Sequence, residues 1–177
     1  MTRVQSRHGS AVVTLPSDLE IMITRRFDAP AALVFEAWTT PELVRRWWGW
    51  DSSSLIVCDI DLRPGGSWRY VTREADGREL GWHGTYLEID RPHRLTSTEV
   101  FEGNPEGGVR NTLTLSEHEG TTTLTVVGLY SSMANRDGHV GSGMERGMQH
   151  SMDRFEDLLA ELRATSRRAH THSEVAP

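Results

Sequence analysis

Two side chains in the middle of the chain could act as a general acid or base. His83 lies in a run of residues that we predict as a strand, and Glu99 lies in the next predicted strand. An imidazole or carboxyl group inside an apolar cavity could serve a cyclase, a hydratase or a hydrolase as its base. The alternative for His83 is an ordinary surface histidine, which is the commoner case. We therefore keep both as weak catalytic candidates and favour a non-enzymatic function.

Other catalytic and cofactor chemistry has little support in the sequence. The eight histidines show no HxxxH or HExxH spacing, so we expect no metal site. Neither GxGxxG nor GxxxxGK[ST] occurs, and we expect no dinucleotide or other cofactor. Cys58 has no partner motif for nucleophilic catalysis.

Aromatic and methionine side chains give the stronger indication of a site. They occur on neighbouring predicted strands and on one face of the last predicted helix, and such residues typically line small-molecule pockets. His83 would offer one polar contact. The alternative is an ordinary core in which the same side chains meet directly. The predicted ligand-binding residues are Trp68, Tyr70, Trp82, His83, Phe101, Met144, Met148 and Met152.

The last helix is predicted from Gly143 to Leu162 because apolar residues recur there at steps of three and four. Its apolar stripe is methionine in the first half and Phe and Leu in the second. Methionine gives an adaptable surface, so we expect the first half to line a cavity and the second half to enter the core. The alternative is a core helix in which methionine fills gaps.

The elements before this helix alternate apolar and polar residues or carry turn signals. We predict one strand, two short helices and six strands in hairpins, which together with the last helix make an α+β domain. A seven-stranded antiparallel sheet of this kind curls around the long helix. Residues 1–18 are predicted as a flexible extension, 19–164 as the domain and 165–177 as a disordered tail. The predicted elements are Leu19–Phe27, Ala31–Trp38, a second helix that begins at Pro41 and ends around Trp47–Gly49, and then Leu55–Leu62, Ser67–Arg73, Glu79–Ile89, Arg94–Phe101, Val109–Ser116 and Thr121–Tyr130.

Composition excludes some partners. The net charge is −6 and no Lys/Arg run interrupts the chain, which disfavours nucleic acid. No apolar run approaches the roughly 20 residues of a membrane span. A single cysteine excludes an internal disulfide and favours a cytoplasmic protein. Trp47, Trp48 and Trp50 cluster at a helix end, where an exposed patch would indicate a homodimer face or a cavity lip.

Several short motifs, in this order and spacing, resemble the START-like or Bet v 1-like (SRPBCC) superfamily. The resemblance is closest to the family named for the activator of Hsp90 ATPase, and it covers roughly residues 19–164. The motifs are Phe27–Pro30, Val34–Thr39, Pro41–Leu43, Trp47–Gly49, Asp61–Gly66, Gly84, Glu88–Ile89, Arg94–Leu95 and Gly147.

This resemblance implies a helix-grip fold with a cavity between the concave sheet and the long helix, usually for an apolar or aromatic molecule. Two positions depart from the family pattern, because Trp50 replaces a proline and Met148 replaces a tryptophan. Our leading hypothesis is a protein that binds such a molecule without turning it over. The alternatives are a polyketide cyclase or hydrolase and a protein-interaction module like the Hsp90 activator, because fold does not fix function.

Overall fold

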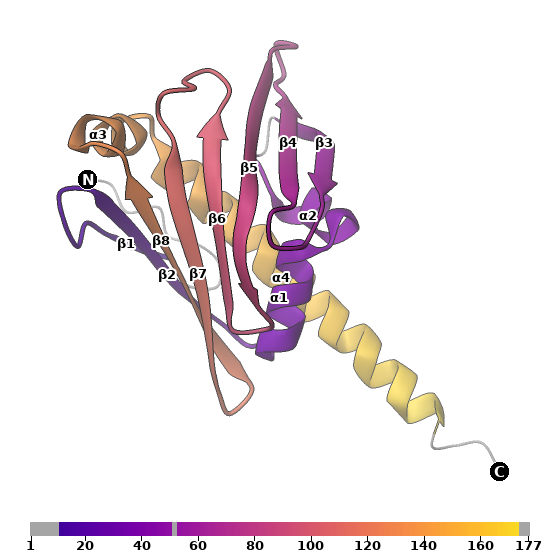
Figure 1. Ribbon diagram of the computed structural model, residues 1–177. Helices are drawn as coiled ribbons and strands as arrows, with labels where there is room; N and C mark the ends of the chain where they lie inside the picture. Colours follow the sequence, from indigo (N-terminus) through magenta and orange to yellow (C-terminus); the bar gives the residue numbers. More distant parts are fainter. Residues whose placement is uncertain (1–10, 51–52, 174–177) are drawn as a thin grey trace.

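The computed structural model describes residues 11–50 and 53–173. In this part of the chain, eight strands form one antiparallel sheet and four helices accompany it (Figure 1). The order across the sheet is β1-β2-β8-β7-β6-β5-β4-β3. The elements are β1 (Val12–Thr14), β2 (Glu20–Phe27), α1 (Ala31–Thr39), α2 (Pro41–Trp47), β3 (Ser54–Ile60), β4 (Ser67–Arg73), β5 (Glu79–Asp90), β6 (Arg94–Phe101), β7 (Val109–His118), β8 (Thr121–Tyr130), α3 (Met133–Gly141) and α4 (Met144–Ser173).

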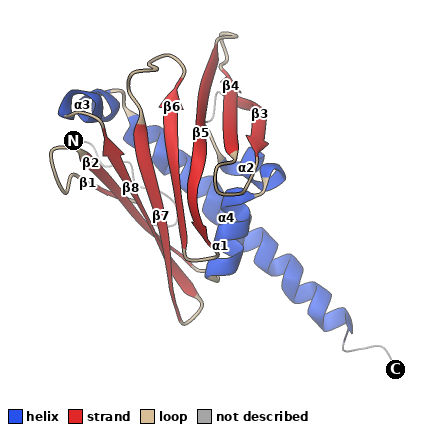
Figure 2. Cartoon of the chain, viewed as in Figure 1, coloured by secondary structure: helices blue, strands red, loops and turns tan. Residues whose placement is uncertain are grey.

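The long helix α4 crosses one face of the sheet. Figure 2 shows it behind the strands, with α1 and α2 beside it and its C-terminal end projecting beyond the sheet. Contacts join α4 to α1, α2 and α3, and α1 also reaches β7 and β8. A curved antiparallel sheet wrapped around one helix confirms the predicted α+β helix-grip fold.

The N-terminal boundary differs from the sequence expectation. Val13 pairs with Ile23 of β2, so part of the expected extension joins the sheet as an eighth strand. Three residues are too few to show a period-two pattern, which is why the sequence does not reveal β1. Residues 1–10 of the expected extension lie outside the described residues.

The C-terminal boundary also differs. Helix α4 continues to Ser173, where the sequence predicts a disordered tail from residue 165. The last part of α4 has no apolar stripe, so the sequence shows no helical period there from which the longer helix could be predicted. Residues 174–177 lie outside the described residues. Within the described residues, no helix combines the length and the apolar character that crossing a membrane requires.

The centre of α4 is fixed by an aromatic cluster. Phe155 is fully buried. Its ring centroid lies 4.7 Å from that of Trp47 and 5.5 Å from that of Trp38. On the sheet side, the ring of Phe27 meets it edge to face at 5.2 Å. Aromatic pairs at these distances stabilise the fold beyond their buried area, so this cluster ties α1, α2, α4 and β2 together.

A buried ion-pair group sets the register of α4 on the sheet. The Arg25 side chain on β2 is only 3% exposed, and its guanidinium lies 2.8 Å from the Asp153 carboxylate and 2.5 Å from the Glu156 carboxylate of α4. A buried guanidinium requires such partners, because an uncompensated charge would be strongly destabilising. The two acidic residues are three apart, so they lie on the same helix face.

We predict that Phe155→Ala lowers the free energy of unfolding by about 3–5 kcal/mol, because the substitution leaves a cavity among packed rings. Urea unfolding followed by circular dichroism measures the change. Leu87→Ala is the control, since this side chain is 47% exposed, and it should cost less than about 1 kcal/mol. A loss below about 1 kcal/mol for Phe155→Ala would contradict the central role of this ring.

Candidate ligand-binding site

Strand parity determines which side chains face α4. Trp68 and Tyr70 of β4 and Tyr86 of β5 are buried and belong to the same core cluster as Phe155. Trp82 shares the face of Tyr86, and Phe101 pairs with Trp82 in the sheet register. The structure therefore brings the four predicted aromatic side chains, together with Tyr86, onto the concave face.

These rings meet through a residue that the sequence does not single out as a wall. Trp48, which follows α2, places its ring 5.2 Å from Tyr70 and 5.0 Å from Trp82. Trp68 and Tyr70 lie 4.9 Å apart, and Trp82 and Phe101 lie 5.3 Å apart. Part of the predicted cavity is therefore filled by direct aromatic contact.

Gly84 allows the Trp68 ring of β4 to lie across β5 on the concave face. A Cβ at this position would lie 1.8 Å from the Thr98 carbonyl oxygen and 2.7 Å from Nε1 of Trp68. With no side chain there, the Trp68 indole spans β5 and donates a hydrogen bond of 3.2 Å to the Thr98 carbonyl. The polar end of a buried indole usually finds such a partner, so glycine fixes the position of Trp68.

The methionines of α4 become less buried toward the helix N-terminus. Met152 is 4% exposed and lies in the core cluster. Met148 is half-buried and packs against that cluster, whereas Met144 is half-buried and belongs to neither of the two core clusters. Burial therefore separates a core half of the helix from a less buried half, and the lining of a cavity by the less buried half stays a prediction.

The segment that carries Trp48 is tied to α4. The Arg154 guanidinium donates hydrogen bonds of 2.9 Å to the carbonyl oxygens of Trp47 and Trp48. The Ser151 hydroxyl donates to the Gly49 carbonyl at 2.6 Å. Trp47 is buried, and Trp48 and Trp50 are half-buried. These tryptophans therefore pack inward, and they do not form the exposed patch that would indicate a homodimer face.

His83 is placed differently from the expectation. It alternates with Trp82 and Gly84, so it projects from the outer face of β5, where it is exposed and pairs in register with Arg69 of β4. Successive side chains of a strand point to opposite faces of the sheet, so His83 must point away from the face of Trp82. We therefore no longer place His83 among the ligand-binding residues or the catalytic candidates.

Glu99 lies on the concave face, in line with Leu95 and Phe101 along β6. Its Oε2 accepts a hydrogen bond of 2.9 Å from the Asn111 side chain on β7. Burial raises the pKa of the Glu99 carboxyl to about 7, and the Asn111 hydrogen bond opposes this shift. The side chain is surrounded by protein yet keeps some exposed surface. Sequence reasoning proposed Glu99 only as a base, and parity with Phe101 could have placed it beside the aromatic residues.

A hydroxyl and an imidazole complete this end of the sheet. The Tyr130 hydroxyl of β8 lies 2.5 Å from Nδ1 of His139 on α3. Burial lowers the pKa of His139, so its ring is neutral at pH 7. Burial, and then the nearby Glu99 carboxyl, raise the pKa of Tyr130. The sequence analysis names neither as a site residue, because Tyr130 appears there only as the end of a predicted strand and His139 lies outside every predicted element.

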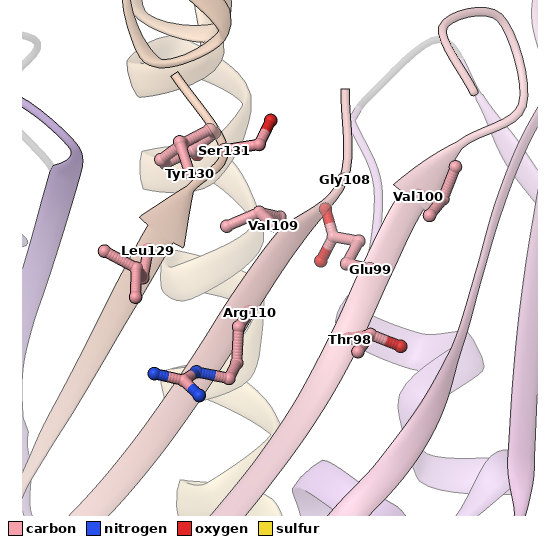
Figure 3. A pocket seen from close by; sticks show the side chains of 9 residues that line it. All are labelled: Thr98, Glu99, Val100, Gly108, Val109, Arg110, Leu129, Tyr130 and Ser131. Atoms are coloured by element: carbon pink, nitrogen blue, oxygen red, sulfur yellow. The ribbon is translucent and has the colours of Figure 1, made fainter. Parts of the chain in front are cut away.

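A hollow of about 560 Å³ opens beside Glu99, at the end of β6, β7 and β8 (Figure 3). It shares no residue with the predicted lining set, but Glu99 and Tyr130 connect its rim to the concave face. Its lining combines aliphatic side chains with the charged Glu99 and Arg110 and with hydroxyl-bearing residues. The lining residues are Thr98, Glu99, Val100, Gly108, Val109, Arg110, Leu129, Tyr130 and Ser131.

The described residues offer neither a cluster of metal ligands nor a reactive thiol. Among the side chains that the structure describes, within residues 11–50 and 53–166, no three His, Cys, Asp or Glu residues lie close enough together to bind a metal ion. The Cys58 thiol is buried, and this burial raises its pKa to about 11, so it is protonated and unreactive at pH 7.

Comparison with known proteins gives a consistent family match. The model of the family described as "Activator of Hsp90 ATPase homolog 1-like protein" matches residues 28–160. No curated protein matches the chain.

Several solved structures are similar to the chain. A Rhodobacter sphaeroides protein is 25% identical with a TM-score of 0.81, and the match covers 86% of this chain and 99% of that one. Protein NE0264 from Nitrosomonas europaea is 26% identical with a TM-score of 0.76, covering 85% and 99%. Protein Ms6760 from Mycobacterium smegmatis is 28% identical with a TM-score of 0.73, covering 84% and 97%. These matches support the fold without assigning a ligand.

We predict that Glu99→Gln stabilises the protein increasingly as the pH rises. A carboxyl whose pKa is raised in the folded state favours the protonated form, so its contribution to stability falls between about pH 4.5 and pH 7. Glutamine keeps the acceptor for Asn111 without the charge. Its advantage in free energy of unfolding should grow by about 2–3 kcal/mol between pH 5 and pH 8.

Urea unfolding at each pH measures this difference. Glu106→Gln is the control, because Glu106 is exposed, and its effect should stay nearly constant with pH. If the Glu99→Gln difference did not change with pH, Glu99 would not be a desolvated carboxyl.

Proposed function

The chain belongs to the family of activator of Hsp90 ATPase homolog 1-like proteins, and on this premise we propose that it binds an apolar or aromatic small molecule. The molecule would lie against the concave face of the sheet, near the N-terminal half of α4, and would leave unchanged. Trp82, Phe101, Met144 and Met148 would contact it.

One observation carries this proposal. Trp82 and Met148 pack against the core cluster and Phe101 packs against Trp82, yet these three side chains and Met144 keep exposed surface, whereas Phe155 further along α4 is fully buried. Apolar surface that faces inward without being covered is stabilised when an apolar ligand removes it from water. Adaptable methionine on one side and flat rings on the other suit an aromatic or lipid-like molecule.

Glu99 favours one alternative, an enzyme of the cyclase or hydrolase type. A carboxyl with a pKa of about 7 is suited to accept and return protons near neutral pH. The Tyr130–His139 pair could orient a substrate oxygen beside it. Long incubation with the bound molecule distinguishes the two functions. Recovery of the unchanged molecule would favour binding alone, and recovery of a rearranged or hydrolysed product would favour the enzyme.

The proposal includes a cytoplasmic location. Its support is the single cysteine, which is buried and free, as expected of a protein that does not depend on an oxidising compartment.

We predict that Met148→Glu weakens the binding of N-phenyl-1-naphthylamine at least about tenfold, because the carboxylate would have to lose water inside an apolar wall. This uncharged aromatic probe becomes fluorescent in apolar surroundings, and a fluorescence titration gives its affinity. Met133→Glu is the matched control, since Met133 is 51% exposed on α3, and it should bind like the wild type.

Circular dichroism and thermal unfolding of each variant establish that it is folded. A folded Met148→Glu variant with wild-type affinity would place the ligand elsewhere and overturn this assignment.

A further inference from the structure

Glu99 is an acidic group that faces an inward surface made of neutral side chains. From β7, Asn111 donates to its Oε2 at 2.9 Å. From β4 and β8, Tyr70 and Tyr130 come close enough for Glu99 to raise their pKa values, after the larger effect of burial. From α3, His139 reaches this group through Tyr130 and is neutral. None of these neighbours carries a positive charge at pH 7.

Two nearby arginines have other partners, and a third, Arg110, lines the same hollow from the opposite face of the sheet. Arg110 is exposed and alternates with Val109, so it projects from the outer face of β7. Arg136 of α3 bonds the Asp137 carboxylate at 2.7 Å and the Ser17 carbonyl at 2.8 Å. Arg25 is paired with α4, as described above. In the described part of the chain, no arginine side chain neutralises Glu99.

Burying a carboxylate without a cation is costly, and a bound cation would offset that cost. Glu99 is among the residues that line a hollow, so a cation there would lie near its carboxyl group, and Figure 3 shows the Glu99 side chain between β6 and β7. Phe101 lies two residues further along the same face of β6, about 7 Å away along the strand. Trp82 packs against Phe101 at 5.3 Å.

We infer that the ligand is an arylalkylamine or a similar amphiphile, whose protonated nitrogen is held by Glu99 and whose ring lies on Phe101 and Trp82. This inference rests on the proposed function and adds the chemical class of the ligand. The separation of about 7 Å corresponds to a nitrogen joined to the ring by a short carbon chain. Tyr130 adds an aromatic face near the cation, an arrangement that also stabilises positive charge.

The test compares three probes of nearly equal shape by isothermal titration calorimetry at pH 8: 2-(1-naphthyl)ethylamine, 2-(1-naphthyl)ethanol and 1-naphthylacetic acid. We expect the wild type to bind the amine about tenfold or more tightly than the alcohol, because a charge-assisted hydrogen bond is stronger than a neutral one. The acid should bind least. In Glu99→Gln, the preference for the amine over the alcohol should fall to about one.

Glu88→Gln is the matched control on β5. Glu88 is exposed and lies 3.5 Å from Arg94, so this variant should keep the wild-type preference. An alcohol that binds as tightly as the amine, or a preference that survives in Glu99→Gln, would overturn the inference.

The pH dependence gives a second readout. Between pH 6.5 and pH 8, the tyrosines stay protonated and His139 stays neutral, so Glu99 is the group at this end that changes charge. The affinity for the amine should rise about three- to fivefold from pH 6.5 to pH 8, whereas the affinity for the acid should fall. A rise for the acid instead would mean that the ionisation of Glu99 does not set the preference.

The two proposals fail in different ways. If N-phenyl-1-naphthylamine binds but the amine has no advantage over the alcohol, the binding function stands and the ligand class is wrong. If no naphthalene probe binds, both the proposed function and this inference are contradicted.

Discussion

The contact of Phe155 with Trp47 and Phe27 determines where α4 crosses the sheet, and the rest of the structure follows from that crossing. Helix and sheet pack tightly there, and the ion pairs of Arg25 hold the same turns of α4. Toward the N-terminus of α4 the burial decreases: Met152 is buried, whereas Met148 and Met144 are half-buried.

The concave face of the sheet carries both aromatic and acidic side chains. Aromatic contacts centred on Trp48 fill part of it, while Glu99 and Tyr130 lie toward the hollow at the sheet end. A carboxyl group in such a position is costly for the empty protein and useful for a bound one. Functional sites often contain groups that lower the stability of the empty protein, and the desolvated carboxyl of Glu99 is such a group.

Much of the fold could be predicted from the sequence, because the α4 stripe and the strand alternation are strong local signals. The sequence could not show which side chains of each strand face α4, because a bulge at Gly81 or Gly84 would have reversed the alternation along that strand. The structure has its irregularities elsewhere, between Leu55 and Val57 and between Tyr86 and Glu88. Trp82 therefore faces inward and His83 outward. The Glu99 carboxyl accepts a hydrogen bond from Asn111 on another strand. No local sequence pattern identifies such a partner.

The central claim is that a small molecule occupies the concave face beneath α4. Native mass spectrometry of the purified protein, followed by denaturation and identification of what is released, tests this most directly. The account predicts a stoichiometric apolar or aromatic adduct, either co-purified or acquired from a library of lipids and aromatic compounds. A protein that keeps its unliganded mass after that challenge would contradict the account and favour a partner protein instead.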